Sequence, residues 1–229
     1  MKQMKVLSVG GSIIIPRTGI DPVFLKKFRA MILEQVKKGD RFVLIIGGGA
    51  TARNYQDGLR NTVKVENEEL DWLGIQATVL NAFFVKQLFG DLAYKEVLSN
   101  PNTKIKTQKP IIIASGWKPG CSTDYDAVLF AKNFGAGEVL NLSNIEYVYD
   151  IDPKVFPEAK KIEEITWKEF RKNIVGDVWS PGSNYPFDPI ASKKAEQLKL
   201  RVGILQGTNL KEVKNALGGK KFKGTIIHP

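Results

Sequence analysis

Three clusters of glycine follow three predicted β-strands of the chain. They are Gly10-Gly11-Ser12, Gly47-Gly48-Gly49, and a longer segment from Gly116 to Asp124 that also contains Gly120. Glycine at a strand-to-helix turn lets backbone N–H groups approach a phosphate closely, and the N-terminus of the following helix adds the positive end of its dipole. A single glycine cluster is common at an ordinary turn. Three such clusters on one sheet edge indicate a protein that binds phosphate groups.

The clusters match neither of the two commonest nucleotide-binding motifs. The sequence has no G-x-x-x-x-G-K-[ST] and no G-x-G-x-x-G. The formal net charge of +10 favours an anionic partner such as a phosphate-bearing metabolite. The basic residues are dispersed in small pairs instead of a stripe, so nucleic acid is not expected as the main partner.

The scarcity of histidine and cysteine excludes several kinds of chemistry. His228 is the single histidine, which argues against Ser-His-Asp hydrolysis and against histidine metal sites. Cys121 is the single cysteine, so neither an intrachain disulfide nor a cysteine zinc cluster is expected. No apolar run reaches the ~18 residues of a membrane span. The N-terminal segment is interpreted as a first strand and not as a signal peptide, and the expected location is cytoplasmic.

The elements that must position the glycine clusters alternate along the chain. Apolar runs predict strands at 5–9, 42–46, 110–114, 139–142, 202–205 and 224–227. Helical spacing and capping residues predict helices at 21–38, 51–59, 71–89, 123–134, 166–172, 189–198 and 211–217. The less regular stretch 143–186 predicts functional loops. The alternation is typical of an α/β fold whose ligands collect at the carboxyl ends of the strands.

Several further motifs, in the same order and spacing, accompany the glycine clusters. They are Ala50-Thr51-Ala52-Arg53, Asp71-Trp72-Leu73-Gly74-Ile75, Asn81-Ala82, Pro119-Gly120, Ser122-Thr123-Asp124, Tyr149, Asp152-Pro153, Asp188-Pro189, Ala191, Lys193 and Gly224-Thr225. Together with the glycine clusters they resemble the uridylate (UMP) kinases of the amino acid kinase family, in their archaeal-type branch. The matches run from residue 5 to residue 229.

This resemblance implies an α/β three-layer sandwich, with a central, mostly parallel sheet flanked by helices. It implies a single domain over residues 1–229, with an acceptor-binding lobe at about 1–135 and an ATP-binding lobe at about 136–229. The implied reaction is direct in-line transfer of the γ-phosphoryl group of ATP to UMP, giving UDP and ADP. Mg²⁺ would be held mainly by the phosphates, with no metal site on the protein. Relatives of this family are typically hexamers built from dimers.

The resemblance also implies roles for individual residues. Lys193 would neutralise the moving phosphoryl group, Asp124 would organise the lysines and donors, and Arg53 would reach the phosphates where the two ligands meet. The implied UMP-binding residues are Gly48, Asp71, Trp117, Lys118, Pro119, Gly120, Cys121, Ser122 and Thr123. The implied ATP-binding residues are Gly10, Gly11, Ser12, Gly49, Arg53, Ser143, Tyr149 and Asp152. The chemistry agrees, because the acceptor is a phosphate that is already ionised and no general base is needed.

These residues also have plainer readings, which the sequence leaves open. Asp71 and Asp124 could merely cap helices, and Arg53 and Lys193 could be solvated surface charges. Trp117 and Tyr149 could be packing aromatics, and Cys121 is assigned no chemistry of its own.

Two departures from the family pattern leave the substrate open. Ser8 stands where relatives commonly carry a lysine, and Glu146-Tyr147 replaces an Asp-Gly turn near the expected ATP site. The alternatives are another small-acceptor kinase of the same family and a non-catalytic nucleotide- or oxyanion-binding relative. An isopentenyl phosphate kinase would be expected to have a histidine in the helix after Gly49, and residues 50–58 contain none. The apolar helix 71–89, with Phe83, Phe84 and Phe89, is a candidate dimer surface.

Overall fold

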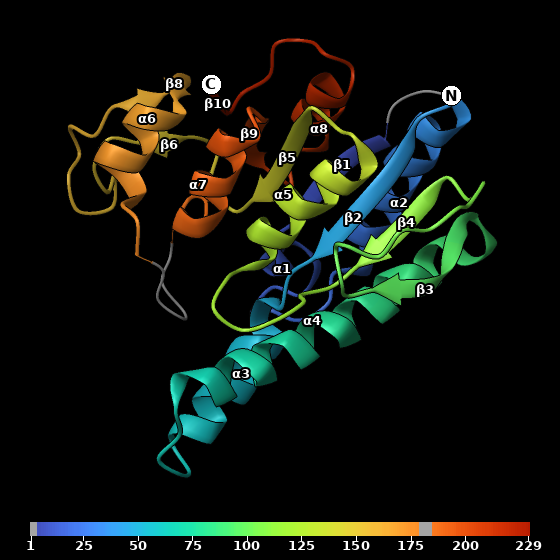
Figure 1. The fold of residues 1–229 in the computed structure, drawn as a ribbon, viewed down its shortest axis with the longest axis horizontal. Coiled ribbons are helices and arrows are strands. Elements are labelled where there is room, and N and C mark those ends of the chain that lie inside the picture. The colour runs from blue at the N-terminus through green and yellow to red at the C-terminus, as the bar shows by residue number, and fades with distance from the viewer. Residues whose placement is uncertain (1–3, 179–184) are drawn as a thin grey trace.

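The fold is organised around an eight-stranded sheet (Figure 1). The computed structural model describes residues 4–178 and 185–229. The strand order is β3-β4-β2-β1-β5-β9-β10-β8, and every neighbouring pair is parallel except β9 with β10. The strands are β1 (Met4–Val9), β2 (Arg41–Ile46), β3 (Ala93–Leu98), β4 (Ile111–Ala114), β5 (Glu138–Ser143), β8 (Glu164–Thr166), β9 (Arg201–Gln206) and β10 (Thr225–His228). A separate antiparallel pair joins β6 (Val148–Tyr149) to β7 (Lys161–Ile162).

Helices cover both faces of the sheet, which confirms the predicted three-layer α/β sandwich (Figure 1). One face is covered by α5 (Thr123–Phe134), α6 (Trp167–Phe170) and α7 (Pro189–Gln197). The other is covered by α2 (Pro22–Lys37), α4 (Asn67–Phe89) and α8 (Leu210–Leu217). The remaining elements are α1 (Gly11–Ile14), α3 (Gly49–Arg60), the 3-10 turn η1 (Gly90–Leu92) and the π-turn η2 (Arg171–Val175).

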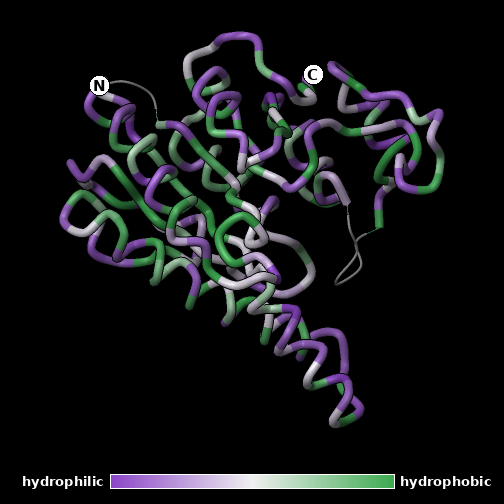
Figure 2. The backbone as a smooth tube through the Cα atoms, turned by 180° about the vertical axis from the view of Figure 1, so that it is seen from behind, coloured by the Kyte–Doolittle hydropathy of each residue, from purple (hydrophilic) through white to green (hydrophobic). Residues whose placement is uncertain are grey.

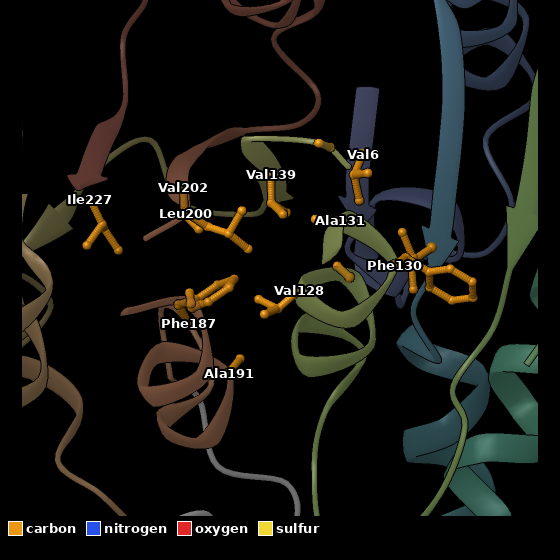
Figure 3. Close-up of a cluster of buried hydrophobic side chains, with 14 of the residues drawn as sticks. Val6, Val128, Phe130, Ala131, Val139, Phe187, Ala191, Leu200, Val202 and Ile227 are labelled. Atoms are coloured by element: carbon orange, nitrogen blue, oxygen red, sulfur yellow. The ribbon is translucent and has the colours of Figure 1, made fainter. Parts of the chain in front are cut away.

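Two hydrophobic cores lie on the two faces of the sheet, because successive strand side chains point to opposite sides. In β1, Val6 belongs to the core beneath α5 and α7, and its neighbour Leu7 belongs to the core beneath α2 and α8. Figure 3 shows the first core, where strand valines meet Val128 of α5 and Phe187 beside α7. Strands buried on both faces explain the continuous apolar runs of the sequence.

The helix ends follow the sequence signals that predict them. Asp21 caps α2, since its carboxylate accepts hydrogen bonds from the N–H groups of Val23 and Phe24 at 2.9 and 3.0 Å. Pro22 occupies the first helical position. Gly39 follows the helix with a φ of 89°, a conformation that favours glycine.

The structure also contains elements that the sequence analysis missed. The edge strand β3 has only its two end residues, Ala93 and Leu98, buried, so it lacks the apolar run of the central strands. The four-residue helix α1 is too short for a periodic pattern. The predicted helix 166–172 is real at its start, but it continues as a π-turn over Arg171–Val175. Within the described part of the loop stretch 143–186 lie three short strands, β6, β7 and β8.

The antiparallel pair α3–α4 extends well beyond the edge of the sheet (Figure 1), and its outer end is mostly hydrophilic (Figure 2). Along α4, Trp72, Leu80 and Phe83 are 43%, 59% and 56% exposed. Phe89 is buried in the core, so it does not belong to the exposed apolar surface predicted on this helix. In the described part of the chain, no helix has the length and apolar character needed to cross a bilayer.

Candidate active site

A cavity of about 820 Å³ opens where β1, β2, β4 and β5 end, at the carboxyl edge of the sheet. Its walls come from α3, α4 and the segments that follow these four strands. The structure brings ten of the predicted site residues to this one cavity: Ser12, Gly48, Gly49, Arg53, Asp71, Trp117, Lys118, Cys121, Ser122 and Thr123. The parallel topology explains this convergence, since the ends of parallel strands share one edge.

Nine predicted site residues do not line the cavity: Gly10, Gly11, Pro119, Gly120, Asp124, Ser143, Tyr149, Asp152 and Lys193. Most of them lie immediately beside residues that do. Ser143 precedes the cavity residue Asn144, and the carboxylate of Asp152 accepts a hydrogen bond at 2.9 Å from the N–H of the cavity residue Lys154. Lys193 is exposed on α7. The ATP-binding roles implied for the second half of the chain therefore stay predictions.

The first two glycine clusters touch each other through their backbones. A Cβ on Gly11 would lie 2.0 Å from the amide nitrogen of Gly49 and 2.6 Å from the carbonyl carbon of Gly47. Gly49 also has a φ of +59°, a backbone conformation that residues with a side chain rarely adopt. Glycine is thus required here for close packing of the two turns. This packing is a second reason for glycine besides phosphate binding.

Asn81 of α4 holds the second glycine turn in place. Its side-chain amide donates hydrogen bonds to the carbonyl oxygens of Gly47 and Gly48 at 3.0 and 2.9 Å, and its own oxygen accepts one from Thr51 at 3.2 Å. Asn81 is buried. The sequence signal for such a role is a polar residue in the middle of an apolar helix. The sequence analysis predicts no individual role for Asn81.

Asp71 ties the loop after β4 to α4. Its carboxylate accepts a hydrogen bond at 3.0 Å from the N–H of Gly120. Burial raises the pKa of Asp71, and the hydrogen bond from Gly120 opposes this rise. The reading of Asp71 as a helix cap is wrong, because α4 begins earlier, at Asn67.

A hydrogen-bonded network that includes the half-buried Asp124 and the buried Asp188 lies beside the cavity. Ser8 of β1 donates to Asp124 at 2.9 Å, and the backbone N–H of Asp188 lies 3.4 Å from the other oxygen of Asp124. The carboxylate of Asp188 in turn accepts from the N–H of Ser122 at 2.7 Å and from the N–H of Ala191 at 2.8 Å. The network therefore connects β1, α5 and α7.

The reading of Asp124 as a helix cap is also wrong. Ser122 caps α5, and its hydroxyl accepts a hydrogen bond at 3.1 Å from the N–H of Asp124. Ser8, the residue that stands in place of a lysine, is buried and bonded to Asp124. The carboxyl group of Asp124 therefore pairs with a buried hydroxyl group on β1, that of Ser8.

Burial makes several of these groups weaker acids. It raises the pKa of Asp124 to about 7, with an added rise from the charge of Asp188. It raises the pKa of Asp126, two residues further along α5, to about 8, against the hydrogen bond from the Trp117 N–H. Burial also raises the pKa of the Cys121 thiol to about 12, which keeps this thiol protonated and unreactive at neutral pH.

These raised pKa values predict that stability falls as pH rises. An unfolded aspartate titrates near 3.9, so the folded chain binds more protons than the unfolded chain between about pH 4 and pH 8. The free energy of unfolding then decreases with pH across this window. We expect Asp126→Asn to remove the contribution of Asp126. The stability of the variant relative to the wild type should rise by about 3–4 kcal/mol between pH 5 and pH 8.

Urea unfolding of both proteins at pH 5, 6, 7 and 8 measures this difference. If the free energies of unfolding of variant and wild type differed by the same amount at every pH, Asp126 would have the same pKa in the folded and unfolded states.

Basic side chains give the cavity its positive character. Besides the predicted Arg53 and Lys118, the walls include Arg17, Arg60 and Lys154, which the sequence analysis did not single out. The Nε atom of Arg53 is buried, and no described residue forms a hydrogen bond with it. Burial lowers the pKa of Arg53, and the nearby Arg17 lowers it further. An anion in the cavity would supply both the missing acceptor and the missing negative charge.

Metal ligands do not gather among the described residues. No group of three or more histidine, cysteine, aspartate or glutamate side chains in residues 4–178 and 185–229 is placed to hold an ion. The groups available along the cavity are backbone N–H groups, hydroxyls and guanidinium groups, a donor set suited to phosphates.

Comparison with known proteins agrees with a cavity whose donors suit phosphates. A model of the amino acid kinase family matches residues 3–206. The uridylate kinase of Methanococcoides burtonii is 32% identical over 91% of this chain and 88% of that protein. That of Methanocaldococcus jannaschii is 30% identical over 97% of this chain and 98% of that protein. The solved uridylate kinase from Archaeoglobus fulgidus aligns with a TM-score of 0.81 at 27% identity, covering 99% of this chain and 100% of that one.

Proposed function

Because this chain belongs to the amino acid kinase family, we infer that it is a nucleoside monophosphate kinase, which transfers the γ-phosphoryl group of ATP to UMP. The products are UDP and ADP. The observation that carries this inference is the similarity to uridylate kinases over nearly the whole chain. It is supported by a cavity at the sheet edge, lined by Arg53, whose buried Nε has no hydrogen-bond partner among the residues that the structure describes.

Seven of the nine residues expected to bind UMP line the cavity, against three of the eight residues expected to bind ATP. We propose that Gly48, Ser122 and Thr123 bind the UMP phosphate, since they lie around one cavity at the start of two helices. Asp71 and Gly120, which are already bonded to each other, would bind the ribose side. Trp117, Lys118, Pro119 and Cys121 would complete the loop around the nucleotide.

The ATP side is proposed from the family resemblance. Gly10, Gly11 and Ser12 would hold the phosphates at the end of β1, with Gly49 and Arg53 at the boundary between the two substrates. Ser143, Tyr149 and Asp152 would lie along the nucleotide. Lys193 would approach the moving phosphoryl group from α7, although it is exposed in this structure. Tyr147, in the altered turn near this side, is buried beneath Lys161, whose Nζ lies 4.8 Å from its ring centre.

Catalysis in this proposal depends on position and charge. The acceptor phosphate is ionised at neutral pH, so the chain needs no general base. Mg²⁺, held mainly by the phosphates, supplies charge neutralisation when it is bound. Arg53 stabilises negative charge that develops between the two substrates, and the backbone N–H groups of the glycine turns keep the phosphates in line.

Three further expectations accompany the proposal. The chain would form an oligomer built from dimers, with the exposed Trp72, Leu80 and Phe83 of α4 in an interface. It would act in pyrimidine nucleotide synthesis in the cytoplasm. The lobes at about 1–135 and 136–229 would bind acceptor and ATP respectively.

The proposal is tested by measuring ADP release from Mg-ATP with UMP, CMP, dUMP and isopentenyl phosphate as separate acceptors. We expect turnover that depends on UMP. Turnover with a different acceptor alone would contradict UMP as the substrate. Nucleotide binding without turnover would favour a non-catalytic relative. A Lys193→Ala variant tests the lysine separately, because a role in transfer requires a lower kcat.

A further inference from the structure

Asp126 is a buried acid that the mechanism above does not use. It lies on α5, is 2% exposed, and lines the cavity. Its Oδ2 atom accepts a hydrogen bond at 3.1 Å from the N–H of Trp117. Its Oδ1 atom is also buried, yet it has no hydrogen-bond partner among the residues that the structure describes. A carboxyl oxygen placed in this way at a cavity wall indicates that a ligand supplies the partner.

The hydrogen bonding of Asp126 determines where its proton lies. A buried carboxylate without a compensating cation takes up a proton, because burial disfavours the charged form. Since Oδ2 already accepts a hydrogen bond, the proton belongs on Oδ1, which then becomes a donor with no acceptor among the described residues. In agreement, burial raises the pKa of Asp126 to about 8. The titratable groups that face it are Asp124, Asp188, Lys118, Cys121 and Tyr125.

Part of the cavity wall near Asp126 is uncharged and suits a flat, neutral group. Trp117, whose N–H is bonded to Asp126, follows Gly116, and Gly116 lies against Ile75 and Thr78. The hydroxyl of Thr78 is already engaged, since it accepts from the Gly116 N–H at 2.8 Å and donates to the carbonyl of Ile75 at 2.6 Å. The arginines of the cavity come from α3 and from the loop after α1. A phosphate would bind near those arginines, which leaves the end beside Asp126 for the base.

We propose that Asp126 is the residue that selects the acceptor's base, by donating a hydrogen bond from Oδ1 to the 4-oxo group of uracil. This inference rests on the proposed function and names the specificity determinant of the same site. Cytosine carries an amino group at that position, which is a donor and cannot accept this hydrogen bond. Two donors would then face each other, and CMP would be rejected.

Asparagine is the informative substitution because it keeps the donor. Its amide oxygen can accept from the Trp117 N–H, and its amide nitrogen then donates toward the cavity. Unlike the acid, the amide does not titrate. We expect Asp126→Asn to keep the preference for UMP over CMP at every pH. The wild type should lose this preference as pH rises from 6.5 to 9, since ionised Asp126 accepts from the cytosine amino group.

Alanine removes the group altogether. We expect Asp126→Ala to lower the ratio of kcat/KM for UMP to that for CMP by at least about tenfold at pH 6.5. Asp57→Asn is the matched control, because Asp57 is also an acid of the cavity wall but pairs with Arg60 on α3. It should leave the ratio unchanged. Calorimetric dissociation constants for UMP and CMP, measured without ATP, give a readout independent of turnover.

The two failures are distinguishable. If the wild type does not use UMP, the proposed function fails. If it uses UMP but Asp126→Ala weakens UMP and CMP equally, Asp126 has no role in selecting the base. A pH profile of Asp126→Asn that follows the wild type would likewise overturn the inference. Thermal unfolding of each variant confirms that the compared proteins are folded.

Discussion

Arg53→Ala is expected to lower kcat/KM for UMP by about 10³-fold, close to 4 kcal/mol of transition-state stabilisation. The Nε atom of Arg53 is buried without a partner among the described residues, and Arg17 lies near enough to lower its pKa. The guanidinium group is thus held at a position that is unfavourable until an anion binds. Its stabilising effect is therefore realised only with an anion present, so its loss should appear in kcat/KM, which compares the transition state with free enzyme and free substrate.

Arg60→Ala is the matched control for this prediction. Arg60 lies on the same helix and lines the same cavity, but it is paired with Asp57 at 3.2 Å and is well exposed. Because such surface pairs contribute little, we expect at most about a fivefold change. Steady-state kinetics of both variants, with UMP varied at saturating Mg-ATP, measure the contrast. Equal losses in the two variants would assign the effect to the general charge of the cavity instead of to Arg53.

Gly11→Ala is expected to destabilise the fold by roughly 4–5 kcal/mol or more, a large share of the stability of a typical domain. The new Cβ would lie 2.0 Å from the amide nitrogen of Gly49 and 2.6 Å from the carbonyl of Gly47. Both are backbone atoms, so no side-chain rotation relieves the overlap. The two glycine turns would have to separate, and the cavity wall would move with them.

Gly58→Ala is the control for this substitution. Gly58 lies in α3, and a Cβ there would meet nothing within 4 Å. Alanine in an open helical position should raise stability by about 0.5–1 kcal/mol. Urea unfolding gives the free energy of both variants. A Gly11→Ala protein as stable as the wild type would mean that the two turns are not packed as closely as described.

Much of the fold could be predicted because its central strands are buried on both faces. Continuous apolar runs such as Phe42–Ile46 leave few alternatives to a parallel strand, and the prediction of a three-layer sandwich is confirmed. The edge strand β3 was missed for the opposite reason. Its middle residues face solvent, so tertiary pairing with β4 forms it without a local pattern.

The site was predictable where chemistry is local in sequence. Five residues of the loop after β4 line one cavity together with Gly48: Trp117, Lys118, Cys121, Ser122 and Thr123. The network of Ser8, Asp124 and Asp188 was not predictable, because it joins residues distant in sequence that meet only in the folded sheet. Asp126 did leave a signal: it stands four residues before the buried Phe130, so a carboxyl group occurs on an apolar helix face.

The position of β1 in the sheet constrains how a nascent chain can fold. β1 pairs with β2 on one side and with β5 on the other, and β5 begins only at Glu138. During synthesis, β1, β2, β4 and β3 can associate early, while the second edge of β1 stays unpaired. An apolar strand edge of this kind can pair with other chains. Rapid arrival of β5 therefore protects the ribosome-bound chain from aggregation, and pauses in translation between residues 114 and 138 would lengthen the exposure.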